Sequence, residues 1–437
     1  MRTFTLVDLE PQAFDAFSAA HPYGNFQQTS AMGAQRERRG IRVLYLGVLE
    51  DGELVAATQL EVHGSGISCF AEIHDGPMVD FRDAELLSFL VDGTAKRARE
   101  AGAVQLEVTP EAPYRLRDTN GHPLPTPDGD EPWLANVPAG ADASANDEGV
   151  ANLLALGFTH TGFNIGYTDV PRWRYLKDLS GISTEDELLA SYAKKTLRNN
   201  IRIAASSGVA VRTIGRDDLP TFHGICELSC EKQGFENQPL EYLELLYDVL
   251  GDDIEFKVAY IDLASYIGSW REKRSKFLAQ IEHLEGLLEK NPNSKKPRRQ
   301  LADVQEQLGG AEKRIREAEE LMAEVGKVAP AAAAAFAWHP RECVYLFSGA
   351  DQRFARFYPA IAIQHENMLA CIERGCTRYN FYGISGVFDD PDDPTAGLTE
   401  FKQGFGGYVE ELMGSFTLVL KPGVYRAKKL ARKLLGR

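Results

Sequence analysis

Lys402 is the residue whose setting most clearly suggests chemistry. It lies in residues 397–407, Gly-Leu-Thr-Glu-Phe-Lys-Gln-Gly-Phe-Gly-Gly, among aromatic side chains and four closely spaced glycines. Glycine permits backbone conformations and close approaches that side chains forbid. The lysine could therefore direct its positive charge at a substrate held against bare backbone. A solvated loop lysine is the alternative interpretation.

A second candidate binding element is a pair of long amphipathic segments. Apolar residues recur at alternating spacings of three and four from Ile267 to Leu288, where Arg274 interrupts the seam, and again from Leu301 to Val325. This rhythm predicts an antiparallel two-helix coiled coil with arms of roughly 35 Å. Its basic tip would suit an anion such as an RNA backbone, whereas a rigid strut or a dimer handle fits equally well. The basic residues at the tip are Lys290, Lys295, Lys296, Arg298 and Arg299.

A metal site is a weaker interpretation of one further helix. His223, Cys226 and Cys230 follow one another at spacings of three and four. Zinc sites usually combine such ligands with a second pair, and the sequence offers no further Cys-x-x-Cys. We therefore predict core thiols beside a polar histidine, and no metal site.

The elements that would position these residues alternate between strands and helices, which predicts a mixed α/β protein. Residues 41–62 predict a hairpin that turns at Asp51-Gly52, and a helix over 84–101 precedes a strand over 104–108. Residues 118–148 show no periodicity and predict a long loop. Later helices are predicted over 184–205, 217–230, 241–250 and 358–374, and later strands over 256–261, 331–338, 343–347 and 379–382.

Four segments, in this order and spacing, resemble the Fem family of aminoacyltransferases, which build the cross-bridges of bacterial peptidoglycan. They are residues 25–30 (Asn-Phe-Gln-Gln-Thr-Ser), 197–204 (Leu-Arg-Asn-Asn-Ile-Arg-Ile-Ala), 379–386 (Tyr-Asn-Phe-Tyr-Gly-Ile-Ser-Gly) and 397–407. The helical hairpin lies where the family often has one. The resemblance covers nearly the whole chain.

The resemblance implies an α/β (α+β) fold with two GNAT-like acyltransferase domains and a coiled-coil arm in the second. The first domain would span residues 1–156, completed by 413–437. The second would span 157–266 and 327–412, with the arm over 267–326. The implied reaction moves an amino acid from aminoacyl-tRNA, the cosubstrate, to an amino group on the stem peptide of lipid II or a related UDP-linked muropeptide. No other cofactor is expected.

The family pattern also assigns residues to the donor. Lys402 would stabilise the oxyanion formed when an amine attacks the aminoacyl ester, or would hold the 3′-terminal phosphate of the tRNA. Phe401 would stack on the terminal adenine. The remaining residues assigned to tRNA binding are Lys295, Lys296, Arg298 and Arg299.

Precursor binding falls to Arg36, Gln238, Tyr382 and Gly383. Arg36 stands where the family tends to carry a lysine that grips the precursor's phosphates, and arginine keeps that charge. A surface arginine is the alternative. Two positions depart from the family: Gln238 replaces a frequent arginine, and Thr109 replaces an aspartate that precedes a proline. Thr109 cannot act as a base.

Composition and charge indicate where the protein works. The hydrophobic fraction of 44% is ordinary, no apolar run reaches about 18 residues, and the six scattered cysteines form no disulfide framework. Because the N-terminus also lacks the apolar core of a secretion signal, we predict a cytoplasmic protein. The net charge of −15 argues against non-specific coating of nucleic acid.

The C-terminal tail differs from the rest of the chain. Residues 421–437 hold seven lysines and arginines and no acidic residue. Interleaved apolar residues would suit a helix lying on anionic lipid at the inner face of the plasma membrane. A frayed, solvated terminus is the alternative.

Two other functions are open at this level. An acyl-CoA-dependent N-acetyltransferase would share the fold type, but it requires a pyrophosphate-binding Arg/Gln-x-x-Gly-x-Gly/Ala loop that the sequence lacks. A non-catalytic protein could use the coiled coil for interaction, and the departures at Thr109 and Gln238 keep that interpretation open.

Overall fold

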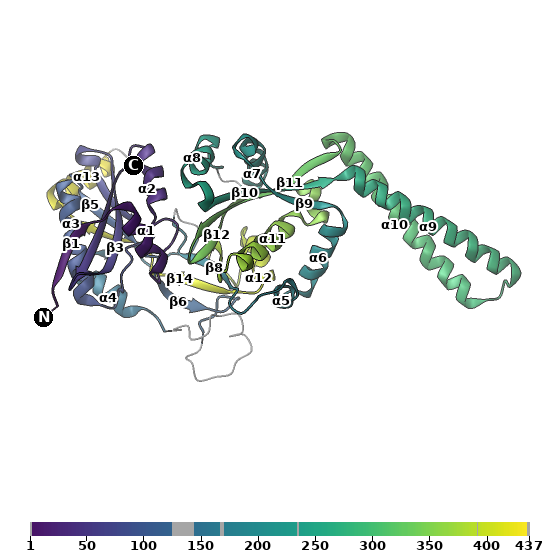
Figure 1. Cartoon of the computed structure of the whole chain (residues 1–437), viewed down its shortest axis with the longest axis horizontal. Coiled ribbons are helices and arrows are strands. Elements are labelled where there is room, and N and C mark those ends of the chain that lie inside the picture. Colours follow the sequence, from purple (N-terminus) through teal and green to yellow (C-terminus); the bar gives the residue numbers. More distant parts are fainter. Residues whose placement is uncertain (1, 125–143, 167–169, 234–235, 391, 435–437) are drawn as a thin grey trace.

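The computed structural model describes residues 2–124, 144–166, 170–233, 236–390 and 392–434. Two sheets with their covering helices lie side by side, and a long helical hairpin projects from the second (Figure 1). The predicted mixed α/β organisation is therefore present. Most of the predicted loop over 118–148 lies outside the described residues, and its last two residues already belong to a helix.

The first sheet has seven strands, in the order β1-β2-β3-β4-β5-β15-β7. The predicted hairpin at Asp51-Gly52 is present as β2 and β3, with both turn residues at positive φ. Alternation along the strands sends Leu60, Ala71 and Leu106 into an apolar core. The bounds are β1 (Phe4–Asp8), β2 (Arg42–Glu50), β3 (Glu53–His63), β4 (Phe70–His74), β5 (Gln105–Thr109), β7 (Thr159–His160) and β15 (Phe416–Val419).

Among the described residues, five α-helices accompany this sheet. The predicted helix over 84–101 is present as α3, which begins after Asp83, whose side chain accepts a hydrogen bond from the Leu86 N–H at 3.1 Å. The chain leaves α3 through Gly102 at φ +100°, a conformation that suits glycine. The bounds are α1 (Pro11–Ala20), α2 (Ser30–Arg38), α3 (Ala84–Glu100), α4 (Asp147–Ala155) and α13 (Pro422–Leu434).

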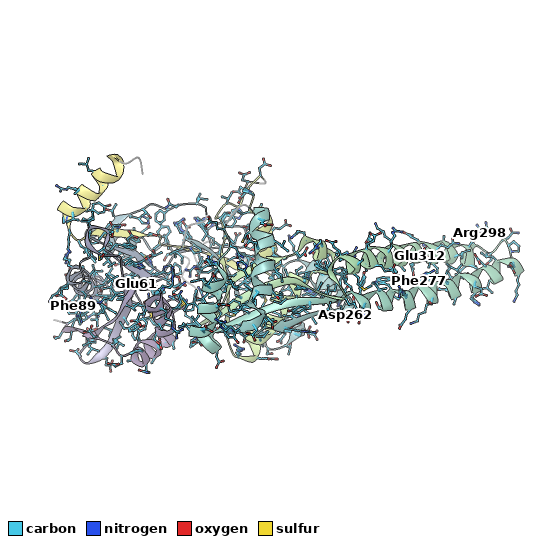
Figure 2. All side chains as sticks on the ribbon, turned by 90° about the horizontal axis from the view of Figure 1, so that it is seen from above. Glu61, Phe89, Asp262, Phe277, Arg298 and Glu312 are labelled. Carbon is cyan, nitrogen blue, oxygen red and sulfur yellow. The ribbon has the colours of Figure 1, made fainter. Side chains whose placement is uncertain are left out.

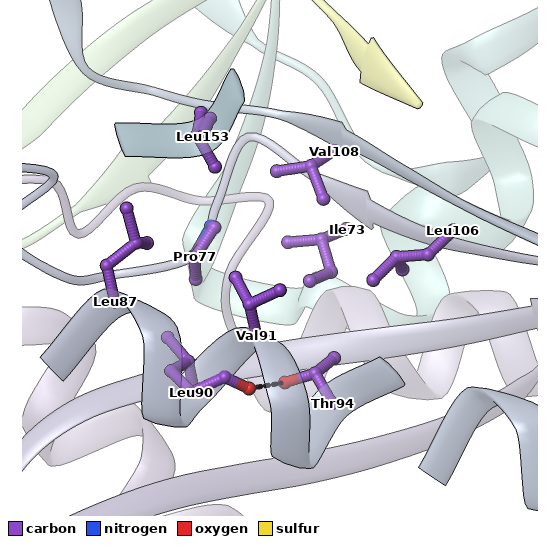
Figure 3. A pocket seen from close by; sticks show the side chains of 9 residues that line it. All are labelled: Ile73, Pro77, Leu87, Leu90, Val91, Thr94, Leu106, Val108 and Leu153. Carbon is purple, nitrogen blue, oxygen red and sulfur yellow. Dashed lines mark hydrogen bonds between the residues drawn. The ribbon is translucent and has the colours of Figure 1, made fainter. Parts of the chain in front are cut away.

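A small apolar pocket lies between α3 and strands β4 and β5 (Figure 3). Thr94 is the polar side chain in its lining, and its hydroxyl donates to the Leu90 carbonyl at 2.7 Å. The pocket therefore offers a ligand no free polar group, and it belongs to the core that supports the sheet.

The second sheet has eight strands, in the order β6-β14-β8-β13-β12-β11-β10-β9. The alanine run predicted as a buried strand forms the centre of β11, which explains how helices on both faces pack closely against it. The bounds are β6 (Pro113–Arg117), β8 (Trp173–Asp178), β9 (Val209–Thr213), β10 (Ile254–Asp262), β11 (Val328–His339), β12 (Glu342–Ala350), β13 (Arg378–Gly383) and β14 (Tyr408–Leu412).

The helices of the second sheet match the prediction except in two places: the helix predicted over 184–205 is divided, and the helix over Ala396–Gly404 was not predicted. The single helix predicted over 184–205 is wrong: the chain breaks at Ser191–Lys194, where the Lys194 N–H donates to the Gly404 carbonyl at 3.2 Å. Thr184 caps α5 and forms a capping box with Glu187. The bounds are α5 (Glu185–Ala190), α6 (Lys195–Ser206), α7 (Leu219–Gln233), α8 (Leu240–Leu250), α11 (Pro359–Glu373) and α12 (Ala396–Gly404).

The two sheets exchange short strands. β6 comes from the first part of the chain yet pairs with β14 in the second sheet, and β7 lies in the first sheet although it follows residue 156. From the C-terminal segment, β15 pairs antiparallel with β5. The other strands of the first sheet come from residues 4–109, and those of the second sheet from residues 173–412.

The helical hairpin is formed by α9 (Leu263–Lys290) and α10 (Lys295–Val325). At 1.5 Å per residue these helices are about 42 and 46 Å long, more than the predicted 35 Å, because both continue to the sheet. Leu284 of α9 and Val304, Ala311 and Ile315 of α10 are buried along the predicted seam. Arg274 leaves the seam.

Candidate functional site

Lys402 lies on a helix, not in a glycine-rich loop. The segment forms α12, and Lys402 is only 3% exposed, which excludes the solvated alternative. The glycines serve the close packing that follows the helix: a Cβ on Gly407 would lie 2.0 Å from the Leu176 carbonyl oxygen of β8. The helix end is thereby pressed directly against the second sheet.

The ammonium group of Lys402 meets the end of β13. Its Nζ donates a hydrogen bond to the carbonyl oxygen of Gly383 at 2.5 Å. Burial lowers the pKa of Lys402 to about 7, because its surroundings disfavour the charged form. The residue can therefore exist in either charge state near neutral pH.

The backbone around Gly383 is irregular in a way that exposes this carbonyl to Lys402. The register between β13 and β8 shifts between Asn380 and Gly383, and Tyr382 lies at φ +62°. The Asn380 side-chain oxygen accepts a hydrogen bond from the Tyr382 N–H at 2.8 Å and holds this turn. Strained backbone of this kind is concentrated at functional sites.

A buried charge cluster joins the two sheets beside Tyr382. Arg174 of β8 lies with its guanidinium carbon 5.3 Å from the centre of the Tyr382 ring. It pairs with Asp75 at 2.9 Å and also with Glu111, both from the first sheet's side. Burial, together with the nearby Asp75 carboxylate, raises the pKa of Glu111 to about 8 against the opposing effect of Arg174.

A second buried group adjoins this cluster. Arg378 pairs with Glu342 at 2.9 Å and forms two 2.7 Å hydrogen bonds with Glu410. Burial alone would raise the pKa of Glu342, but Arg378, Arg341 and Arg174 lower it to about 2. The sequence did not identify the charged residues of these two groups, because only their long-range pairing distinguishes them from ordinary surface charges. They are Asp75, Glu111, Arg174, Arg378 and Glu410.

Lys177 is a second buried lysine that the sequence did not reveal. Its Nζ donates to the carbonyl oxygens of Phe405 at 2.9 Å and Gly406 at 3.2 Å. Burial lowers the pKa of Lys177 to about 8. The Lys177 side chain therefore binds two backbone carbonyls just after α12 and fixes the C-terminal end of the helix that carries Lys402.

The predicted precursor residues are dispersed. Arg36 is not the surface arginine of the alternative interpretation: it is 5% exposed, its Nε lies 2.7 Å from Glu61 Oε1, and it donates to the Gln27 carbonyl at 2.9 Å. Gln238 is exposed near the N-terminus of α8. Tyr382 and Gly383 lie at the Lys402 contact described above.

Arg36 is connected to the central charge cluster along one face of the first sheet. Ion-pair contacts of 3.8 Å or less lead from Glu61 through His63, Glu72 and His74 to Asp75. Glu61 and His63 alternate along β3, and Glu72 and His74 along β4, so these four side chains share a face opposite the apolar core.

The predicted donor residues separate into two places. Phe401 is half-buried, and its ring centre lies 5.4 Å from that of Phe405. The basic residues of the tip lie at the far end of the hairpin, where Figure 2 labels Arg298, whereas Glu61 lies within the first unit. A ligand that meets both Lys402 and the tip has to be long.

The thiols of α7 lie in the core, as predicted. Cys226 and Cys230 are buried, and burial raises the pKa of both. Among the described residues, the group whose spacing would suit a metal is instead Glu61, His63 and Glu72.

Comparison with known proteins decides the family. The FemAB family profile matches residues 9–433, nearly the whole chain. The protein belongs to the FemAB family. Aminoacyltransferase FemA of Staphylococcus aureus strain MW2 is 27% identical over 437 residues, covering 98% of this chain and 99% of FemA. FemA of the bovine strain RF122 / ET3-1 has the same identity and coverage.

A solved structure shares the fold. The crystal structure of FemX matches with a TM-score of 0.73 and 24% identity, covering 97% of this chain and 99% of FemX. The predicted Fem resemblance and the fold class are confirmed. This FemAB protein is an enzyme of the acyltransferase class.

Proposed function

We propose that this FemAB protein transfers an amino acid from aminoacyl-tRNA to an amino group on the stem peptide of lipid II or a related peptidoglycan precursor. Membership of a family of aminoacyltransferases supports the reaction type. The observation that supports an RNA donor is the hairpin, whose basic tip lies about 40 Å from the second sheet, against which α12 and Lys402 pack. A tRNA is long enough to contact the tip while its 3′ end enters the body.

The buried ammonium of Lys402 supports the acyl-transfer chemistry. An aminoacyl ester is already activated, so the enzyme must orient the amine and stabilise the oxyanion that forms on attack. A preorganised cation in a water-poor site serves this purpose well. Gly383 holds Lys402 Nζ in place, and Lys177 fixes the helix from which the side chain extends.

The acceptor side is supported by the polar face of the first sheet. Arg36 offers a guanidinium to the precursor's phosphates, with Glu61 and Gln27 fixing its orientation. Thr109 lies on the same sheet as a neutral residue, its Oγ1 3.4 Å from Ser415 Oγ. We assign no base to Thr109; the attacking amine loses its proton to substrate or water.

The C-terminal helix supports work at the inner surface of the plasma membrane, where a lipid-linked acceptor resides. Figure 2 shows α13 projecting away from the first unit, with Arg426 and Lys429 exposed and Leu430 60% exposed. None of the described helices combines the length and apolar character needed to cross a bilayer. Basic and apolar residues on one such helix favour binding to anionic lipid.

The deciding experiment is a transfer assay with the full chain, a mixture of radiolabelled aminoacyl-tRNAs and lipid II. We expect label to move to the lipid-linked peptide. A UDP-linked muropeptide replaces lipid II in a second arm, and acetyl-CoA with the same acceptors forms the third. Acetyl transfer without aminoacyl transfer would refute the proposal.

A further inference from the structure

The geometry points to a binding site for one divalent transition-metal ion, of the Zn²⁺ or Mn²⁺ class, formed by Glu61, His63 and Glu72. This site lies outside the Lys402 centre and does not depend on the proposed substrates. Its three side chains come from adjacent strands of one sheet, β3 and β4. Their ligand atoms all lie within 4.8 Å of one another.

The two distances from His63 to the carboxylates match those around a bound ion. Bonds of 2.0–2.2 Å arranged tetrahedrally place neighbouring ligand atoms about 3.3–3.6 Å apart. His63 Nε2 lies 3.3 Å from Glu61 Oε2 and 3.5 Å from Glu72 Oε2. An ion could therefore enter with little movement of the two strands. One imidazole with two carboxylates is a donor set that zinc and manganese accept.

The hydrogen bonding of His63 is the second observation. Its Nε2 is buried and, among the described residues, has no hydrogen-bond partner, although both carboxylates are near. The nitrogen is therefore close to both oxygens but is not aligned for a hydrogen bond with either. The ring is held in this orientation by stacking on Phe70, with ring centres 4.7 Å apart and planes 9° apart.

The charges of the two carboxylates and of Arg36 are compatible with a bound cation. Glu61 is 96% buried as a side chain; its Oε1 lies 2.7 Å from Arg36 Nε, and its Oε2 lies 3.3 Å from His63 Nε2. Arg36 offsets one of the two carboxylate charges. His74 Nδ1 lies 3.8 Å from Glu72 Oε1 and occupies the side of that carboxylate that faces away from His63. Such outer partners commonly orient metal ligands.

The test is calorimetric titration of chelator-treated, dialysed full-length protein with Zn²⁺ and, separately, Mn²⁺. We expect one ion per chain, and at least tenfold weaker binding by His63→Gln and by Glu72→Gln. His283→Gln, on the exposed surface of the hairpin, is the matched control and should bind as the wild type does. Unchanged affinity in the His63 and Glu72 variants, or no binding to the wild type, would overturn the proposal.

A spectroscopic measurement on the wild type avoids dependence on how the variants fold. Co²⁺ added to the protein should give visible absorption typical of nitrogen and oxygen ligands, and Zn²⁺ should displace it. A sulfur-to-cobalt charge-transfer band would place the ion on a cysteine and would contradict the assigned ligands.

Discussion

Lys402 Nζ donates to the carbonyl oxygen of Gly383 across 2.5 Å, and this bond joins α12 to the irregular end of β13. The two residues belong to separate motifs in the sequence. Their contact turns the two motifs into one site, in which a buried cation is held by backbone rather than by a carboxylate. A charge held in this way is available to an oxyanion.

Replacing Lys402 by Met should therefore slow transfer strongly and preserve the fold. We expect kcat to fall by about 10²–10³, the usual effect of losing one oxyanion-stabilising group. The measurement is single-turnover transfer, with circular dichroism to check folding. Lys194→Met removes a nearby exposed lysine, paired with Glu400 at 2.5 Å, and should leave the rate within about twofold of wild type.

The pH dependence should report the lowered pKa of Lys402, about 7. The cation that stabilises an oxyanion exists below this pKa and is lost as pH rises through it. A descending limb near pH 7 in kcat/KM is the expected result. The residual activity of Lys402→Met should lack that limb, while the ascending limb from the acceptor amine remains in both. An identical descending limb in the variant would assign it to another group.

The Arg174 cluster should control stability asymmetrically. Arg174→Met leaves the Asp75 carboxylate buried without its arginine partner, which should lower the free energy of unfolding by about 3–5 kcal/mol. Glu111→Gln should cost less than about 1 kcal/mol at pH 7, because the wild-type carboxyl already favours its neutral form there. Urea unfolding measures both. A larger loss for Glu111→Gln than for Arg174→Met would contradict the assignment.

The same carboxyl predicts a pH effect on stability. The pKa of Glu111 is raised in the folded state to about 8, so the folded protein binds an extra proton between that value and its ordinary pKa. Its stabilising contribution is complete at about pH 4 and is lost as pH rises through 8. Glu111→Gln should flatten the decline, measured by urea unfolding at several pH values, whereas exposed Glu85→Gln should not.

The hairpin tip should govern affinity for the RNA donor. Changing Lys295, Lys296, Arg298 and Arg299 together to Gln should weaken tRNA binding and reduce its salt dependence, because fewer counterions are released. Filter binding at several salt concentrations measures both. The matched control neutralises Lys313 and Arg316, exposed basic residues nearer the body on α10. Equal losses of tRNA affinity in the two variants would indicate attraction by the overall positive charge of the hairpin and not a specific contact at the tip.

The C-terminal helix should bind anionic lipid. Arg426→Glu with Lys429→Glu should reduce co-sedimentation with phosphatidylglycerol vesicles at low salt, where charge attraction is least screened. Vesicles of neutral lipid provide the baseline. If the double variant bound the vesicles as well as the wild type does, α13 would be a solvated terminal helix and not a lipid-binding one.

Local sequence patterns predicted helices and strands correctly where a single local feature, such as a turn dipeptide or a regular apolar spacing, determined the structure. The turn at Asp51-Gly52 specified a hairpin because both residues adopt positive φ. The spacing of three and four specified the long hairpin, and Arg274, the one polar residue in the predicted seam, turns outward toward Glu312 at 3.4 Å. In these cases the local chemistry and the final structure agree.

The remaining features depend on contacts between distant parts of the chain. The break before α6 arises because the Lys194 backbone bonds to Gly404, and neither residue signals a helix end by itself. Asp75 and Arg174 pair across 99 positions, so no window of sequence contains the cluster. Lys402 was identified by its motif, but its burial could not be foreseen because its glycines indicated a loop.

The position of β15 between β5 and β7 has a consequence for how the protein is made. The first sheet contains strands encoded from the fourth residue onward, yet it remains open until residues 416–419 arrive. During synthesis the first sheet lacks the strand between β5 and β7 until nearly the whole chain has left the ribosome. The two units consequently complete their folding together. A first unit truncated before β15 would expose the unpaired edge of β5, which could pair with strands of other molecules.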